Sequence, residues 1–177
     1  MKLNVVQDLA ARTLLVILAA AVVQDFMYMK ISNRLILMGI LFSLAFGFMT
    51  GGLRQVLYVL VNISFPVFVL YLFYLLGVLG AGDIKLFSII GGFTNFKLLT
   101  GCMFYSFVAA AVIAVGKMLY NRNLRISVFK AGIFFRSIPR EGLVSYHKEW
   151  AERRNLMHFS VPILIGYMVA VLHWKLY

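Results

Sequence analysis

Charged residues are scarce in this chain of 177 residues, and cysteine is nearly absent. Asp, Glu, Lys and Arg make up 13% of the sequence, about half their share in an ordinary soluble domain. Hydrophobic residues make up 63%, and the mean hydropathy is +0.93. So much apolar side chain does not fit inside one soluble core, and a disordered chain needs many charges and few apolar residues. The single cysteine, Cys102, excludes a disulfide framework and a multi-cysteine zinc site. The composition therefore predicts an all-α polytopic membrane protein.

Acidic residues are the scarcest charged type, with 6 against 17 Lys and Arg, for a net charge of +11. In a membrane protein such cations collect in cytoplasmic loops and meet anionic headgroups, so we expect no nucleic-acid partner. Asp25 and Asp83 stand beside long apolar runs. The other four acids lie near the N-terminus or in one basic segment: Asp8, Glu141, Glu149 and Glu152.

Charge-free runs predict about six transmembrane helices in one membrane-embedded domain, residues 1–177. The first is 13–24, extended by 9–11, and the others are 35–53, 55–82, 86–96 (at most 83–97, counted from Asp83 to Lys97), 98–116 and 155–174. A ~30 Å hydrocarbon core needs ~20 residues of helix. The fourth run would reach only ~22 Å, so we expect it to be short, little tilted, or partly in a wet cavity.

The distribution of Lys and Arg predicts the orientation. Six spans place both termini on one side. The connections after spans one, three and five hold twelve of the basic residues, and the opposite side holds five. Positive charge collects on the cytoplasmic side. We therefore expect Asp25 and Asp83 at the cytoplasmic face and both termini outside.

The basic segment at 121–154 connects spans five and six and holds eight Lys or Arg and three Glu. Within it, residues 127–139 interleave aromatic and aliphatic side chains with Lys130 and Arg136. This pattern predicts an amphipathic cytoplasmic loop that lies on anionic lipid headgroups.

Asp25 and Asp83 have several interpretations. Taken singly, each is as well explained as a solvated acid at a helix end, paired with Lys30 or Lys85. Taken together, two carboxylates within hydrogen-bonding distance share one proton, which suits acid–base catalysis of peptide hydrolysis. A proton- or ion-coupled transporter or channel, or a non-catalytic assembly subunit, could use the same acids. A transporter would usually place them near mid-bilayer and show internal repeats, and no repeat is present.

Two stretches resemble the type IV prepilin peptidases, the G-x-G-D aspartic proteases of bacterial membranes. GAGDIKL at residues 80–86 is similar to the family's G-x-G-D-x-K-L signature. DFMYMKISN at residues 25–33 is similar to its other aspartate segment, except that Ser32 stands where the family usually has Pro. The hydrophobic layout agrees along nearly the whole chain, apart from the long loop.

The resemblance implies that Asp25 and Asp83 are the catalytic pair, holding a water that cleaves the basic leader of prepilin-like proteins at the cytoplasmic face of the bacterial inner membrane. It implies no cofactor, and the scattered histidines predict no metal site. Gly80 and Gly82 are candidate close-approach positions for substrate, since glycine allows unusual backbone dihedrals and close contact. Lys85 could tune an aspartate or meet lipid phosphates.

The sequence lacks the loop with two C-x-x-C pairs that the larger enzymes of the family carry. It therefore resembles the small, peptidase-only branch associated with tight-adherence (Flp-type) pili. Asn33 is expected to cap the second span, where Asn is favoured. The oligomeric state is not predicted.

Overall fold

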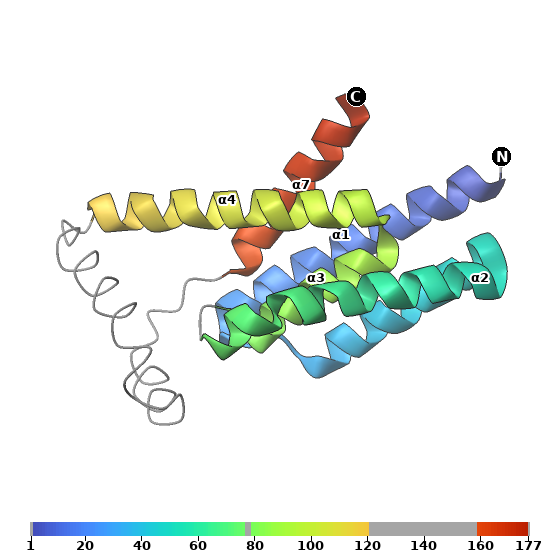
Figure 1. The fold of residues 1–177 in the computed structure, drawn as a ribbon, viewed down its shortest axis with the longest axis horizontal. Coiled ribbons are helices and arrows are strands. Elements are labelled where there is room, and N and C mark those ends of the chain that lie inside the picture. Colours follow the sequence, from blue (N-terminus) through green and yellow to red (C-terminus); the bar gives the residue numbers. More distant parts are fainter. Residues whose placement is uncertain (1, 77–78, 121–158, 177) are drawn as a thin grey trace. The chain divides into compact units, whose positions relative to one another are not determined.

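The computed structural model describes residues 2–76, 79–120 and 159–176, and those residues form helices with short connections. The helices are α1 (Lys2–Tyr28), α2 (Asn33–Leu75), α3 (Ala81–Phe93), α4 (Phe96–Tyr120) and α7 (Ser160–Leu176) (Figure 1). The prediction of an all-α protein is confirmed for this part of the chain. The basic segment at 121–154 lies outside the described residues.

Two compact units divide the chain. One comprises residues 1–108 with 158–177, and the other residues 109–157. All contacts discussed below lie within the first unit. Of the second, the structure describes the last turns of α4, residues 109–120.

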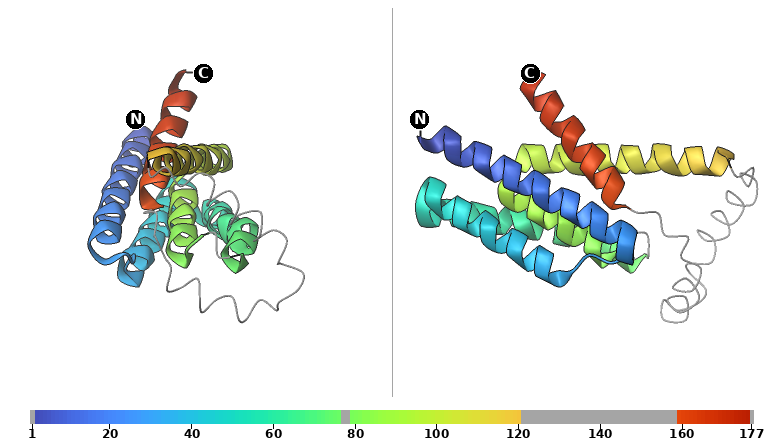
Figure 2. Two further views of the ribbon diagram at one scale, coloured as in Figure 1. Left: turned by 90° about the vertical axis from the view of Figure 1, so that its left-hand side faces the viewer. Right: turned by 180° about the vertical axis from the view of Figure 1, so that it is seen from behind.

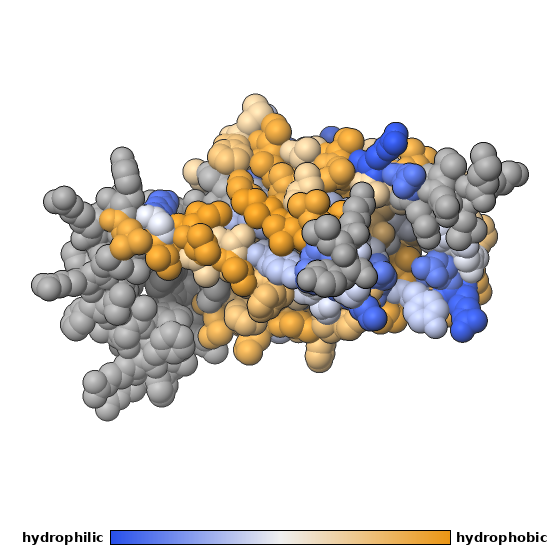
Figure 3. All heavy atoms as spheres, turned by 90° about the horizontal axis from the view of Figure 1, so that it is seen from above, coloured by the Kyte–Doolittle hydropathy of each residue, from blue (hydrophilic) through white to orange (hydrophobic). Residues whose placement is uncertain are grey.

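In the part of the chain that the structure describes, three helical stretches are long and apolar enough to cross a membrane: Asp8–Tyr28, Asn33–Leu75 and Phe96–Lys117. Ser160–Trp174 is a shorter apolar helix. Many large hydrophobic side chains on α1, α2, α4 and α7 are exposed, and Phe68 is 87% exposed. Hydrophobic side chains cover much of the described part of the face shown in Figure 3. Water-soluble proteins rarely expose contiguous apolar surface on this scale, whereas lipid tails accept it.

Helix α2 consists of two helical segments that meet at Gly51 and Gly52. Gly52 has φ 61° and ψ −150°, a combination that is essentially confined to glycine. The chain reverses direction there (Figures 1 and 2). The segments 33–50 and 53–75 pack closely together. A Cβ built on Gly47 would lie only 3.0 Å from Val59 Cγ2. At 1.5 Å per residue they are about 27 and 35 Å long.

These segments correspond to the predicted second and third spans, with different boundaries. The second segment ends at Leu75, not at residue 82. The chain cannot stay helical to residue 82, because Gly80 is extended (φ −80°, ψ 151°) and serves as the N-cap of α3.

Helix α3 is short, bounded by the extended residues Gly80 and Thr94, and it is enclosed by other helices. Its 13 residues measure about 20 Å, and eight of them are buried. It packs against α1, α2 and α7. Gly91 and Gly92 permit this enclosure, since a Cβ on Gly91 would lie 2.5 Å from the Asn62 carbonyl oxygen and one on Gly92 would overlap Ser43 Oγ. The predicted short fourth helix is confirmed.

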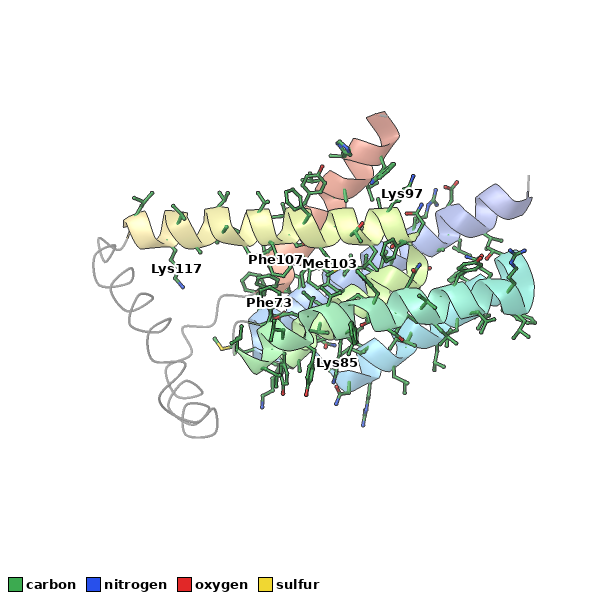
Figure 4. The ribbon with its side chains drawn as sticks, in the orientation of Figure 1. Phe73, Lys85, Lys97, Met103, Phe107 and Lys117 are labelled. Atoms are coloured by element: carbon green, nitrogen blue, oxygen red, sulfur yellow. The ribbon has the colours of Figure 1, made fainter. Side chains whose placement is uncertain are left out.

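An aromatic cluster ties four segments together near the start of α3. The Phe107 ring on α4 lies 5.8 Å from Phe73 on α2, 6.4 Å from Phe87 on α3 and 5.9 Å from Phe159. Phe73 and Phe107 are labelled in Figure 4. Phe159 directly precedes α7, so this cluster fixes where α7 begins.

Candidate active site

One end of the first unit gathers the sequence-predicted residues. The last turn of α1, the first turn of α2, the end of α2 and the first turns of α3 and α7 lie at this end (Figures 1 and 2). Asp25 lies in the last turn of α1, and Asp83 lies in the first turn of α3. Contacts between these segments show how the chain holds them together.

Asp25 is half-buried and is held by a distant part of the chain. Its backbone carbonyl accepts a hydrogen bond from the Met29 amide (2.9 Å), which closes the end of α1. Its carboxylate Oδ2 accepts a hydrogen bond from the hydroxyl of Ser160, the first residue of α7, at 2.6 Å. The helices that carry the two ends of this bond pack against each other.

Asp83 is half-buried and starts its own helix. The Gly80 amide donates to Asp83 Oδ2 at 3.1 Å, and the Asp83 amide donates to the Gly80 carbonyl at 3.1 Å. The first of these bonds is the Asp83 half of a capping box, and Gly80 has no side chain to make the other half. An acid in the first turn also interacts favourably with the positive end of the helix dipole. The GxGD sequence therefore builds the start of α3 directly.

The turn between α1 and α2 brings the two aspartate segments into contact. The Ser32 amide donates to Gln24 Oε1 at 3.0 Å, which folds the turn back onto α1. Ile31 in this turn lies against Gly82, where a Cβ would be 3.4 Å from Ile31 Cδ1. The segment that follows Asp25 thus packs on the residue that precedes Asp83.

Lys85 makes a second link between the segments. Its Nζ donates to Asn33 Oδ1 at 2.9 Å, which joins the first turns of α3 and α2. Figure 4 shows Lys85 beside the start of α2. Both side chains are exposed, so water competes for this hydrogen bond.

One expectation about this region needs correction, and the approach of substrate at Gly80 and Gly82 stays a prediction. Ser32, not Asn33, is the N-cap of α2, and its Oγ accepts from the Arg34 amide at 3.3 Å. Asn33 is the first helical residue, which leaves its side chain available to Lys85. Gly80 has no unusual dihedral, and the space at Gly82 is that of ordinary van der Waals contact. The tight glycine contacts are deeper in α3, at Gly91 and Gly92.

Sequence reasoning missed Ser160 and Gln24. Each holds part of the site through one hydrogen bond, Ser160 to Asp25 and Gln24 to the Ser32 amide. A serine that opens an apolar helix is ordinarily a cap, so nothing in the sequence signalled a partner 135 positions away. Within residues 2–76, 79–120 and 159–176, no three His, Cys, Asp or Glu side chains form a group that could hold a metal ion.

Comparison with known families matches the chain to one of them. The profile described as the type IV leader peptidase family matches residues 13–115, more than half of the chain, and this region includes both aspartate segments. Comparison with curated proteins and with solved structures found no match. The chain therefore belongs to the type IV leader peptidase family, the aspartic hydrolases that act on prepilins.

Proposed function

We propose that this protein is a membrane aspartic endopeptidase that removes the leader of prepilin-like substrates, with Asp25, Asp83 and a water molecule as its catalytic groups. One observation carries the assignment of residues. The two aspartate segments, at the ends of their helices, pack on each other through Ile31 and Gly82, which supports the assignment of both acids to one site. Family membership supplies the class of reaction and of substrate.

The chemistry needs no covalent intermediate. One carboxylate takes a proton from the water as the water oxygen attacks the carbonyl carbon of the scissile peptide. The other carboxyl group, protonated, gives its proton to the carbonyl oxygen. When the C–N bond breaks, the leaving nitrogen receives the proton that the first carboxylate took from the water, and a hydroxyl of the tetrahedral intermediate gives its proton back to the second carboxylate. The pair then again holds one proton, and a new water binds. Because the pair titrates as a unit, we assign neither role to one acid alone.

The residues around Asp83 suit an extended substrate. Gly80 and Gly82 carry no side chain, so a peptide can approach the backbone at the start of α3. Lys85 donates a hydrogen bond to Asn33. We propose that it holds α2 and α3 together at the site, in addition to any contact that it makes with substrate. A prepilin leader is basic by family analogy, and its charge would repel a lysine.

We propose six membrane spans in a single membrane-embedded domain: α1, the two segments of α2, then α3, α4 and α7. Twelve basic residues against five place the acid end at the cytoplasmic face of the bacterial inner membrane. The basic segment at 121–154 would lie on anionic lipid there. The lack of paired cysteines supports the peptidase-only, tight-adherence branch.

A transporter that uses the same acids fits less well. A relay across the bilayer needs ionisable groups along its depth. Asp25 and Asp83 both lie in terminal turns at one end of their helices. This placement suits a reaction at the membrane surface.

The test of this function is leader removal in cells that express the protein with a prepilin-like substrate. Asp25→Asn and Asp83→Asn should each lower the rate by about a thousandfold or more, because each removes one partner of the acid–base pair. Asp8→Asn is the matched control, since Asp8 lies exposed on α1 and far from the last turn, and it should cleave normally. Mass spectrometry of the substrate reads the result. Normal cleavage by either Asp25→Asn or Asp83→Asn would overturn the mechanism.

A further inference from the structure

Ser160 is a buried polar residue whose hydroxyl points to a proposed catalytic acid. Its side chain is only 1% exposed. The hydroxyl donates to Asp25 Oδ2 at 2.6 Å, a short distance typical of bonds to a charged acceptor. The serine lies beyond residues 13–115, the region that matches the family.

The start of α7 is firmly held, so the hydroxyl has a fixed position. Phe159 packs on the Phe107 ring at 5.9 Å, and Pro162 and Ile163 in the first turn are fully buried. Proline is favoured in a first helical turn because it has no amide hydrogen to satisfy. One turn later, a Cβ on Gly166 would overlap Ser106 on α4, so α4 and α7 touch at the backbone.

Asp25, by contrast, sits where its own helix gives little support to a negative charge. It lies in the last turn of α1, at the negative end of that helix dipole. Ser160 is the first residue of α7, so its hydrogen bond to Asp25 places the carboxylate at the N-terminus of α7. That end of the helix dipole is positive. A donor at Oδ2 also restrains rotation of the carboxylate about the Cβ–Cγ bond, so both oxygens keep a set direction.

We propose that Ser160 is a positioning residue for Asp25, holding its carboxylate in the orientation that peptide hydrolysis requires. The inference rests on the proposed function. Ser160 acts through Asp25 and not on the substrate. Its loss should therefore lower kcat and leave KM nearly unchanged.

Purified enzyme and a synthetic prepilin-like peptide test the proposal. Ser160→Ala should lower kcat by about ten- to a hundredfold, the usual worth of one hydrogen bond to a charged group, with KM within about twofold. Ser160→Thr keeps the hydroxyl and should restore most of the rate. Ser88→Ala is the matched control, because Ser88 is buried and its hydroxyl bonds only within α3, to the Ile84 carbonyl at 3.2 Å. It should match the wild type.

A second readout is independent of turnover. The chain has three aspartates, Asp8, Asp25 and Asp83, so protein labelled with carboxyl-¹³C aspartate gives three assignable NMR signals. Ser160→Ala should move the Asp25 signal and leave the Asp8 signal in place, and the Asp83 signal should follow Asp25 only as far as the two acids share a proton. Should that variant not reach the folded state in detergent, Ser160→Cys replaces it, with the same expected direction because a thiol is a weak donor.

The outcomes separate this inference from the proposed function. An unmoved Asp25 signal with wild-type kcat in Ser160→Ala would overturn the positioning role, while inactive Asp→Asn variants would still uphold the peptidase. Equal losses in Ser160→Ala and a folded Ser160→Thr would also overturn it, because they would show that packing and not the hydroxyl matters. Active Asp25→Asn would instead overturn the proposed function itself.

Discussion

Asp83 combines a structural and a proposed chemical role in one side chain. Its carboxylate accepts from the Gly80 amide at 3.1 Å and so defines the first turn of α3. The same group is proposed to exchange protons with water and substrate. A substitution that removes activity there has two explanations, lost chemistry or a lost helix start, and the two are separable.

Asp83→Asn and Asp83→Ala should differ in stability although both are inactive. Asparagine keeps an oxygen that accepts from the Gly80 amide, whereas alanine leaves that amide without its acceptor. Both lose the carboxylate charge, so their difference isolates the hydrogen bond. The free energy of unfolding in detergent should be lower for the alanine variant by about 1 kcal/mol. Equal stabilities would show that the cap contributes nothing to α3.

At the scale of single residues, the sequence indicated Asp25 and Asp83 but not the residue whose side chain bonds to Asp25. Asp25 and Asp83 could be found because few acids stand beside apolar runs and because GAGDIKL is a specific motif. Ser160 could not, since its bond to Asp25 depends on how α7 packs on α1. The sequence predicts Asn33 as the N-cap where the structure has Ser32, because serine and asparagine are nearly equal as N-caps.

At the scale of elements, the reversal inside α2 depends on the backbone of Gly52. Hydropathy predicted a break at Arg54, and the structure has it two residues earlier. The glycine provides dihedrals that other residues do not reach, and no neighbouring atom lies within 4 Å of where its Cβ would be. Backbone strain is therefore the dominant effect of a substitution there.

Gly52→Ala should destabilise the protein by about 1–3 kcal/mol, the usual cost of a strained dihedral pair. Gly116→Ala is the control, because a Cβ at that helical position in α4 also meets no atom within 4 Å. It should stabilise by about 0.5–1 kcal/mol through helix propensity. Unfolding titrations in detergent compare the two. A harmless Gly52→Ala would show that the reversal tolerates an ordinary backbone.

The length of α3 illustrates the limit of hydropathy. A short apolar run predicted a short helix, and that prediction is confirmed. Its burial among α1, α2 and α7 could not be predicted, because burial depends on Gly91 and Gly92 meeting Asn62 and Ser43 from another helix. Only the three-dimensional arrangement shows which glycines permit close contact.

At the scale of the molecule, the orientation in the membrane is a prediction from charge. Lys30, Arg34 and Lys85 lie in the turn between α1 and α2 and in the first turns of α2 and α3, at the acid end of the first unit, whereas Arg54 follows the reversal in the middle of α2. The positive-inside rule then places the acids in contact with the cytoplasm.

Cysteine labelling should show this orientation. In a Cys102→Ser background, which removes the chain's one cysteine, Arg54→Cys should react with a membrane-impermeant maleimide on intact cells. Lys30→Cys should react only after the membrane is permeabilised. Both residues are exposed, so access depends on the side of the membrane and not on burial. The reverse pattern would place the acids outside and contradict a cytoplasmic reaction.

The bond between Ser160 and Asp25 has a consequence for biosynthesis. Asp25 enters the membrane with the first helix and Asp83 soon after, yet the hydroxyl that orients Asp25 arrives 135 residues behind it. A ribosome-bound chain that has inserted only its first 120 residues would hold both acids in an incomplete arrangement. The enzyme would thus reach its full rate only when its last helix docks, so nascent chains would cleave other proteins more slowly during insertion.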